Sequence, residues 1–506
     1  MKNLAPQKTH GSLLVYNAIV NITGQVIPLL VAVFSIRILI RELTVDRFGL
    51  LTLAWALIGY FSLFDLGLGR AVTQVVAEKL GLGKTEDIPV LAVTAIALIF
   101  GMGTLGAVIL VVISPILTRS VLNIPLELQK EALLSFYLLA FATPLVVLTA
   151  GIRGILEAQQ NFTALNLIRV VMGIFTFLSP IAILPFTHSL VYIVLVLVVG
   201  RVVALGWHLS VCLKSSPYLY INPFNKKYFS LQAISPILRF GGWMTVSNLI
   251  GPLMVYLDRF LIGAFISVAA VSYYVTPYEM VTKLWLIPSA VSSVLFPAFA
   301  ASFNQDSQKV KELFNQGVKY VYLAVFPPSL IIITLAFEGL NLWVGKDYAE
   351  NSTSVAQWLT LGVFINCIAQ IAFALIQGVG RPDLTAKFHL LELPFYFALI
   401  FFGLKYLGIK GVAMAWVIRV IFDAGLLFYL AYRSLLMNTD DLKNIMVLIA
   451  ASFFVLIGAM YVNTLGGKLL YIVVSIAVLG LIVWYKFISL QEKNWLGEYF
   501  GLPLIR

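Results

Sequence analysis

Apolar residues fill almost the whole chain in long runs, and short polar segments separate one run from the next. About 20 apolar residues in a helix cross a bilayer core of about 30 Å, and these runs have that length. The runs are continuous and do not alternate with polar residues, which indicates helices rather than the strands of a membrane barrel. The pattern predicts an all-α polytopic membrane protein of about 14 transmembrane helices, at residues 13–40, 48–69, 88–117, 132–152, 163–186, 189–211, 240–264, 268–300, 318–344, 354–379, 384–404, 409–432, 444–463 and 468–486.

Composition supports a membrane protein. Charged residues make up 11% of the 506 residues and hydrophobic residues 60%, whereas a soluble domain has about 25% charged residues. The net charge of +11 would suit a nucleic acid partner, but the basic residues gather on alternate connections, where the positive-inside rule accounts for them. Among them are Lys79, Lys84, Lys214, Lys226, Lys227, Arg239, Lys309 and Lys311. We therefore expect no nucleic acid partner and both termini in the cytoplasm.

The two halves of the chain show weak internal similarity at an offset of about 220 residues. Residues 155–169 align with 375–389, Arg201 with Arg419, and Arg37 with Arg259. Parallel repeats of six helices, rocking against each other around a ligand, are typical of transporters. The predicted organisation is a six-helix bundle at 1–213, a cytoplasmic linker at 214–236, a second bundle at 237–435, and two further helices with a cytoplasmic tail at 436–506.

Ionisable residues within the apolar spans are the candidates for chemistry. A charge at a helix centre costs about 2.5–3.5 kcal/mol on insertion scales, so deep charges should face a bundle interior or a wet cavity. These residues are Arg37, Asp65, Glu157, Arg169, Arg201, Asp258, Arg259, Glu279, Lys283, Glu338, Glu392, Arg419 and Asp423. Glu279/Lys283 and Arg419/Asp423 stand four residues apart and can neutralise each other on one helix face. Interhelical contacts that only stabilise the fold are the alternative for these pairs.

Asp258 and Arg259 follow an uncharged stretch, Phe240–Leu257. Helix rise places them near the outer mouth, and Arg37 of the first half falls at a similar depth. Two arginines there would suit an anionic, phosphorylated ligand, because arginine binds phosphate oxygens with paired donors. Snorkelling of the charged groups to the membrane surface is the alternative interpretation.

Motifs for an enzyme or a cofactor are weak. The segment Glu78–Thr85, EKLGLGKT, lacks the first glycine of a phosphate-binding loop, and the four histidines have no metal-ligand spacing. No outer connection is long enough for a catalytic domain, which disfavours a membrane polysaccharide polymerase or glycosyltransferase. We expect a protein that is not an enzyme and that uses no metal and no cofactor.

Several motifs together resemble the bacterial polysaccharide flippases, the Wzx-type branch of the multidrug/oligosaccharidyl-lipid/polysaccharide exporter superfamily. They occur in the family's order between about residues 12 and 435, and the motifs are RELTVDRFGLLTLAWAL (Arg41–Leu57), FDLGLGRAV (Phe64–Val72), LEAQQNF (Leu156–Phe162), LDRFLIG (Leu257–Gly263), VLFPAF (Val294–Phe299) and WVGKDYA (Trp343–Ala349).

The resemblance implies two six-helix bundles around a central cavity. It also implies a polyprenyl-diphosphate-linked oligosaccharide as substrate, moved from the cytoplasmic to the periplasmic leaflet of a bacterial inner membrane. Helices 1, 2, 7 and 8 would line the cavity, which adds Arg70 to Arg37, Asp65, Asp258, Arg259, Glu279 and Lys283; Arg201, Arg419 and Asp423 are further candidates.

Proton or sodium coupling, contact with a polysaccharide polymerase and a monomeric state are further expectations. A multidrug exporter of the same superfamily, which should favour an acidic cavity, and a peptidoglycan lipid flippase stay open as alternatives.

Overall fold

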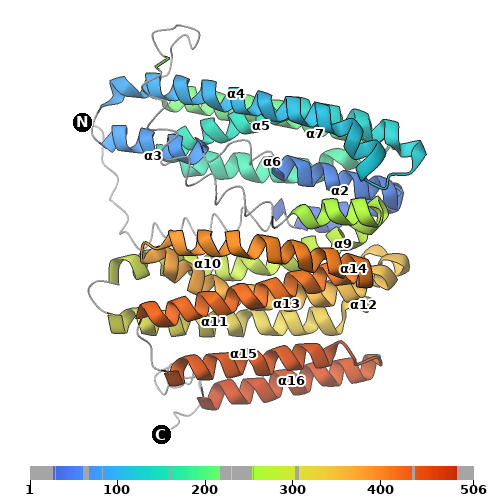
Figure 1. Ribbon diagram of the computed structural model, residues 1–506, viewed down its shortest axis with the longest axis vertical. Coiled ribbons are helices and arrows are strands. Elements are labelled where there is room, and N and C mark those ends of the chain that lie inside the picture. Colours follow the sequence, from blue (N-terminus) through green and yellow to red (C-terminus); the bar gives the residue numbers. More distant parts are fainter. Residues whose placement is uncertain are drawn as a thin grey trace. The chain divides into compact units, whose positions relative to one another are not determined.

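The computed structural model describes residues 27–28, 30–60, 68–81, 84–159, 161–216, 229–230, 254, 256–302, 307–435 and 439–486, and every regular element within these ranges is a helix. Figure 1 shows these helices along the chain. The chain forms two compact units, Met1–Met280 with Ala386–Ala415 and Val281–Thr385 with Trp416–Arg506. The predicted all-α class is confirmed, whereas the predicted boundaries of two six-helix bundles stay a prediction.

The first unit contains long apolar helices joined by short turns. Its elements are α2 (Val45–Tyr60), α3 (Leu68–Gly81), η2 (Thr85–Asp87), α4 (Ile88–Ile116), η3 (Leu117–Val121), α5 (Leu126–Ala158), α6 (Phe162–Ile183), α7 (Leu190–Ser215) and α9 (Val268–Val281, whose last residue lies in the second unit). Residues 30–42 and 256–265 are also helical.

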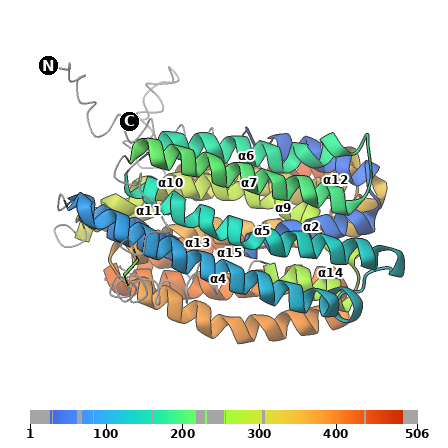
Figure 2. The same cartoon turned by 90° about the horizontal axis from the view of Figure 1, so that it is seen from above.

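Helix α4 shows how the sequence separates a lipid-facing side from a packed side. It has 29 residues without a charge and spans about 44 Å at about 1.5 Å per residue. Ala92, Ala95 and Gly103 are buried, while Phe100 and Val108 are exposed. A Cβ on Gly103 would lie 2.8 Å from Pro144 Cα of α5, so the two helices pack closely. Figures 1 and 2 show α4, α5 and α7 side by side.

The second unit is built around one central helix. Its elements are η6 (Thr282–Trp285), α10 (Leu286–Ser302), α11 (Ser307–Thr334), α12 (Ala336–Val344), α13 (Lys346–Gly378), the two ends of α14 (Pro382–Leu435), α15 (Thr439–Ala459) and α16 (Leu465–Lys486). Helix α13 is largely buried and packs against α10, α11 and α12. The rings of Tyr322, Phe326 and Phe364 pack edge-on or stacked between α11 and α13.

The last two helices, which the sequence left without a role, dock on this unit. The hydroxyl groups of Tyr322 on α11 and Ser452 on α15 share a 2.8 Å hydrogen bond. Lys468 on α16 donates to Glu338 of α12 at 2.8 Å. Figure 1 shows α15 and α16 as a neighbouring pair. These two polar contacts join α15 to α11 and α16 to α12.

Helix α14 is two helices joined at Gly408, which has φ 59° and ψ −143°. A Cβ on Gly403 would lie 2.6 Å from the carbonyl oxygen of Gly411, so the chain approaches itself on the two sides of the bend. A side chain at Gly408 would be strained at this φ. The break that the sequence predicts between residues 404 and 409 is therefore confirmed.

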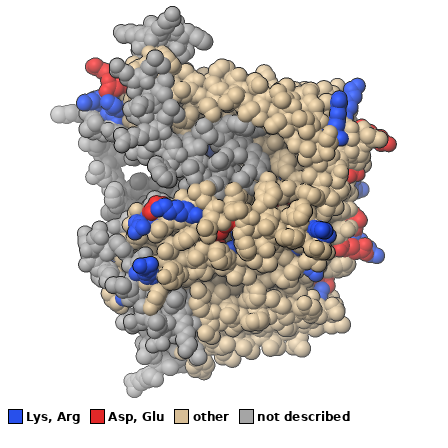
Figure 3. Space-filling view, in the orientation of Figure 1, with Lys and Arg blue, Asp and Glu red and all other residues tan. Residues whose placement is uncertain are grey.

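Within the described residues, nine helices are long and apolar enough to cross a membrane. The count of about 14 spans stays a prediction, because several predicted spans lie partly outside these residues. The predicted span 318–344 is divided at Leu335, and α11 begins eleven residues earlier, at Ser307. Hydropathy does not detect the first turns of α11, since they carry Lys309, Lys311 and Glu312. Most charged atoms visible in Figure 3 lie over the helix ends.

Candidate binding residues and an arginine-lined cavity

Arg259 lies in an enclosed network of the first unit. Arg259 is 3% exposed, and its guanidinium group donates to Glu279 Oε1 of α9 at 3.4 Å. The guanidinium carbon lies 5.0 Å from the ring centroid of Tyr256 and 5.0 Å from that of Tyr278. A carboxylate and two aromatic faces therefore balance this buried charge.

Asp258 takes part in the same network on its other side. It is 1% exposed and accepts hydrogen bonds from the Tyr274 hydroxyl and from the Arg259 backbone N–H, both at 2.7 Å. Tyr274 and Tyr278 stand four residues apart on α9, and their rings stack with centroids 6.3 Å apart. Helix α9 thus supplies Tyr274, Tyr278 and Glu279 to these two charged residues, which helps to explain why adjacent opposite charges are tolerated in an apolar segment.

The other predicted residues are distributed over several elements. Arg37 is exposed on the helix of residues 30–42, and Lys283 is half-buried in η6. Arg419 and Asp423 are buried one turn apart on the second part of α14. Asp65 and the side chain of Arg70 lie outside the described residues. The structure thus brings Asp258, Arg259 and Glu279 together, and the roles of all these residues in binding stay predictions.

Arg201 lies at a cavity of about 390 Å³ inside the first unit. Helices α5, α6 and α7 form the cavity walls, and their lining residues recur three, four or seven positions apart, so each helix presents one face. The described lining residues are Val146, Val147, Thr149, Ala150, Arg153, Leu165, Ile168, Arg169, Met172, Gly173, Thr176, Arg201, Ala204 and His208.

Arg153 and His208 are not among the residues predicted from the sequence, and Arg169 was predicted only as an intramembrane charge. The sequence does contain a signal for the cavity. Arg201, Ala204 and His208 have the spacing that places residues on one face of a helix, and a small residue lies between the two polar ones. Helical spacing does not show which face meets which neighbour. The structure was therefore needed to show that the three helices converge on these residues.

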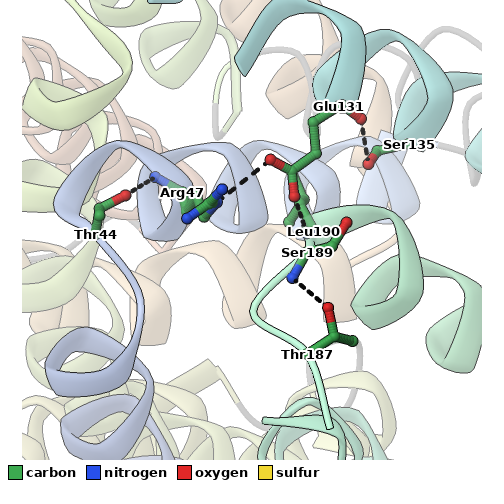
Figure 4. A network of polar contacts seen from close by, with 7 residues as sticks. All are labelled: Thr44, Arg47, Glu131, Ser135, Thr187, Ser189 and Leu190. Carbon is green, nitrogen blue, oxygen red and sulfur yellow. Dashed lines mark hydrogen bonds and ion pairs between the residues drawn. The ribbon is translucent and has the colours of Figure 1, made fainter. Parts of the chain in front are cut away.

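The end of the first unit opposite the connection between α5 and α6 is held by Glu131 of α5 (Figure 4). Its carboxylate accepts from Arg47 Nε of α2 at 3.3 Å and from the backbone N–H of Leu190 at the start of α7. A carboxylate is favourable at a helix N-terminus, because it accepts from an unpaired N–H and complements the helix dipole. One glutamate thus joins three helices at this end.

The other end is held by side-chain hydrogen bonds around the turn between α5 and α6. Asn161 donates to the hydroxyl of Ser215 on α7 at 3.1 Å, and Gln159 donates to the hydroxyl of Ser216. These contacts and those of Glu131 thus tie α5 and α7 together at both ends, and Asn161 ties the start of α6 to the end of α7.

Comparisons with known proteins agree with this fold. The family described as "Polysaccharide biosynthesis protein" matches residues 38–353. Over 423 residues the chain is 32% identical to the "Putative O-antigen transporter" of Shigella flexneri, covering 83% of this chain and 98% of that protein.

Two solved structures share the fold over most of the chain. One is described as "Lipid II flippase MurJ, inward closed conformation", with a TM-score of 0.70 and 14% identity, covering 94% of this chain and 100% of that chain. The other is an inward-facing multidrug resistance MATE family transporter of the MOP superfamily, with a TM-score of 0.69 and 16% identity, covering 84% of this chain and 99% of that chain. At these identities the similarity shows the fold alone.

Proposed function

Because the chain belongs to the polysaccharide biosynthesis protein family that matches residues 38–353, we propose that it is a flippase for lipid-linked oligosaccharides. The proposed substrate is a polyprenyl-diphosphate-linked repeat unit of an O-antigen or a related surface polysaccharide. The protein would move this unit from the cytoplasmic to the periplasmic leaflet of a bacterial inner membrane.

The observation that carries this proposal is the 32% identity to the Shigella flexneri putative O-antigen transporter over 98% of that protein's length. A match of this extent includes the helices that position Arg201 and Arg259, and so it concerns the whole transport unit rather than one motif. The fold of the chain, shared with a lipid II flippase structure at a TM-score of 0.70, is consistent with a transporter.

Charge supports an anionic rather than a cationic substrate. The described lining of the cavity in the first unit contains three arginines and no carboxylate. A multidrug exporter for cationic compounds would be expected to place carboxylates there. Coupling to a proton or sodium gradient, cytoplasmic termini and contact with a polymerase belong to the same proposal.

Deletion of the gene tests the proposal. We expect lipid-linked repeat units to accumulate on the cytoplasmic leaflet, where a probe added outside the cell does not reach the glycan. A plasmid copy of the wild-type gene should restore access of the probe. The measurement combines lipid extraction with external labelling of the glycan in intact spheroplasts.

Other outcomes would identify other functions. Intact repeat units that reach the outer leaflet without being polymerised would contradict translocation and favour a polymerase role. Accumulation of the peptidoglycan lipid precursor would favour a peptidoglycan lipid flippase. Normal glycan lipids together with sensitivity to cationic drugs would favour a multidrug exporter.

A further inference from the structure

The arginine-lined cavity of the first unit has a buried end and an exposed end. Arg201 lies near the middle of α7, about 16 Å from its start and about 21 Å from its end at about 1.5 Å per residue. Arg153 near the end of α5 and Arg169 near the start of α6 are both exposed. His208, which is buried, donates from Nδ1 to the Ala204 carbonyl at 2.8 Å. The cavity thus leads from two exposed cations to a third at mid-helix depth.

Arg201 is the side chain that makes this cavity unusual. Its Nε is buried and has no hydrogen-bond partner, and no ion pair of Arg201 occurs within the described part of the chain. An arginine at the centre of a membrane helix is energetically unfavourable unless its charge finds a partner or water. Leaving a buried donor unsatisfied adds a further cost. A bound acceptor would remove both costs, since arginine donors pair with anionic oxygens.

The charge of the cavity favours such an acceptor. Arg153 pairs with Glu157 at 3.1 Å, which compensates one of the three arginines. Glu157 does not line the cavity, and no other carboxylate lies among its described lining residues. Arg201 and Arg169 both line the cavity, from α7 and α6. Arg201 supplies a positive charge at the buried end, and Arg169 supplies further guanidinium donors nearer the mouth.

We propose that this cavity is an anion site that binds a phosphate group, held by Arg201 at its buried end and by Arg169 at its mouth. Tetrahedral oxyanions accept paired donors from guanidinium groups. The volume of about 390 Å³ exceeds what a single phosphate needs and matches small-ligand pockets of about 300–1,000 Å³. Val147, Leu165 and Met172 add an apolar wall. The phosphate can come from a lipid headgroup or from a free anion.

Ligand-dependent thermal stabilisation of the purified full-length protein tests this site. In a neutral detergent, two probes are titrated separately, inorganic diphosphate and a short-chain phosphatidic acid, with the matching diacylglycerol as the uncharged control. Binding to the folded protein raises its melting temperature with probe concentration and gives an apparent Kd. We expect a phosphate probe to stabilise the wild type and the diacylglycerol to have no effect.

Three variants assign the binding to this cavity. Arg201→Gln should bind at least about tenfold more weakly, and Arg201→Lys should retain only part of the affinity, because an ammonium lacks the paired donors. Arg381→Gln removes an exposed arginine paired with Asp383 in the second unit and should bind like the wild type. If Arg201→Gln does not fold, Arg169→Gln at the exposed mouth takes its place with the same expected loss.

The two probes separate the sources of the phosphate. Stabilisation by phosphatidic acid alone supports a lipid headgroup, and stabilisation by diphosphate, alone or with phosphatidic acid, supports recognition of the oxyanion itself. The inference is overturned if neither probe binds, or if the arginine variants bind as tightly as Arg381→Gln. Binding is measured without transport, so failure here is distinct from failure of the proposed translocation.

Discussion

At the scale of single residues, the buried ion pair of Arg259 and Glu279 separates a structural role from a ligand-binding role. Removing one partner of a buried ion pair costs about 3–5 kcal/mol, because the other charge stays buried without compensation. The Glu279 side chain is 27% exposed, so water compensates part of this loss. We expect Glu279→Gln to destabilise the protein by about 1–3 kcal/mol, measured as a lower melting temperature.

A double-mutant cycle checks this interpretation. The variant Glu279→Gln with Arg259→Gln should recover part of the stability, since the guanidinium charge no longer stays buried without its carboxylate partner. The exposed pair Arg381 and Asp383 is the matched comparison, and its loss should cost about 0–1 kcal/mol. If Glu279→Gln were as stable as Arg381→Gln, the network would not need this pair, and Arg259 would be available for substrate.

At the scale of elements, Gly154 lets α5 pack closely against α3 at Gly69, a residue of the family motif Phe64–Val72. A Cβ on Gly154 of α5 would lie 2.4 Å from the carbonyl oxygen of Gly69. Backbone atoms cannot give way as a flexible side chain can, so Gly154→Val should force the two helices apart. We expect a loss of about 1–3 kcal/mol and a lower yield of monodisperse protein in size-exclusion chromatography.

The control for this substitution is Gly101→Ala on α4. A Cβ at Gly101 meets nothing within 4 Å, and alanine is favoured over glycine in a helix by about 1 kcal/mol. Gly101→Ala should therefore be as stable as the wild type or more stable. A Gly154→Val protein with unchanged melting temperature and yield would show that the two helices do not pack this closely.

Elements also show how far the sequence alone could lead. The predicted span 88–117 matches α4 (Ile88–Ile116) closely, because an uncharged run ends at both sides in polar residues. Span 318–344 was wrong as a single helix, since the break at Leu335 carries no proline or glycine. Helix spacing offered Lys283 as a partner of Glu279, but it gave no sign of the ion pair that Glu279 forms with Arg259 of another helix. Contacts between helices depend on how each is rotated, which periodicity does not specify.

At the scale of the whole molecule, the family resemblance came from ordered motifs and is confirmed by the match over residues 38–353. The cavity with Arg153, Arg169, Arg201 and His208 could not be predicted in the same way. Its residues are single polar positions on three helices, and only their convergence makes a site. The order of the motifs along the sequence thus identified the class of protein, whereas the packing of the helices was needed to identify a candidate ligand-binding site.

Orientation in the membrane is the remaining property of the whole molecule, and it decides which leaflet the cavity mouth faces. The positive-inside rule predicts that the connection between α5 and α6 is cytoplasmic, together with Glu86 and Arg381. Leu126 and Phe186, each 85% exposed, should then lie on the periplasmic side. Both native cysteines are buried, so single cysteines at these positions can be labelled selectively.

We expect a membrane-impermeant maleimide to label Leu126→Cys and Phe186→Cys in intact spheroplasts. Glu86→Cys and Arg381→Cys should react only after permeabilisation. In this orientation Arg153 and Arg169, which flank the connection between α5 and α6, face the cytoplasmic leaflet, where a lipid-linked diphosphate would be made. The opposite labelling pattern would contradict cytoplasmic termini and would place the mouth of the anion site at the outer leaflet, where it would meet a product rather than a substrate.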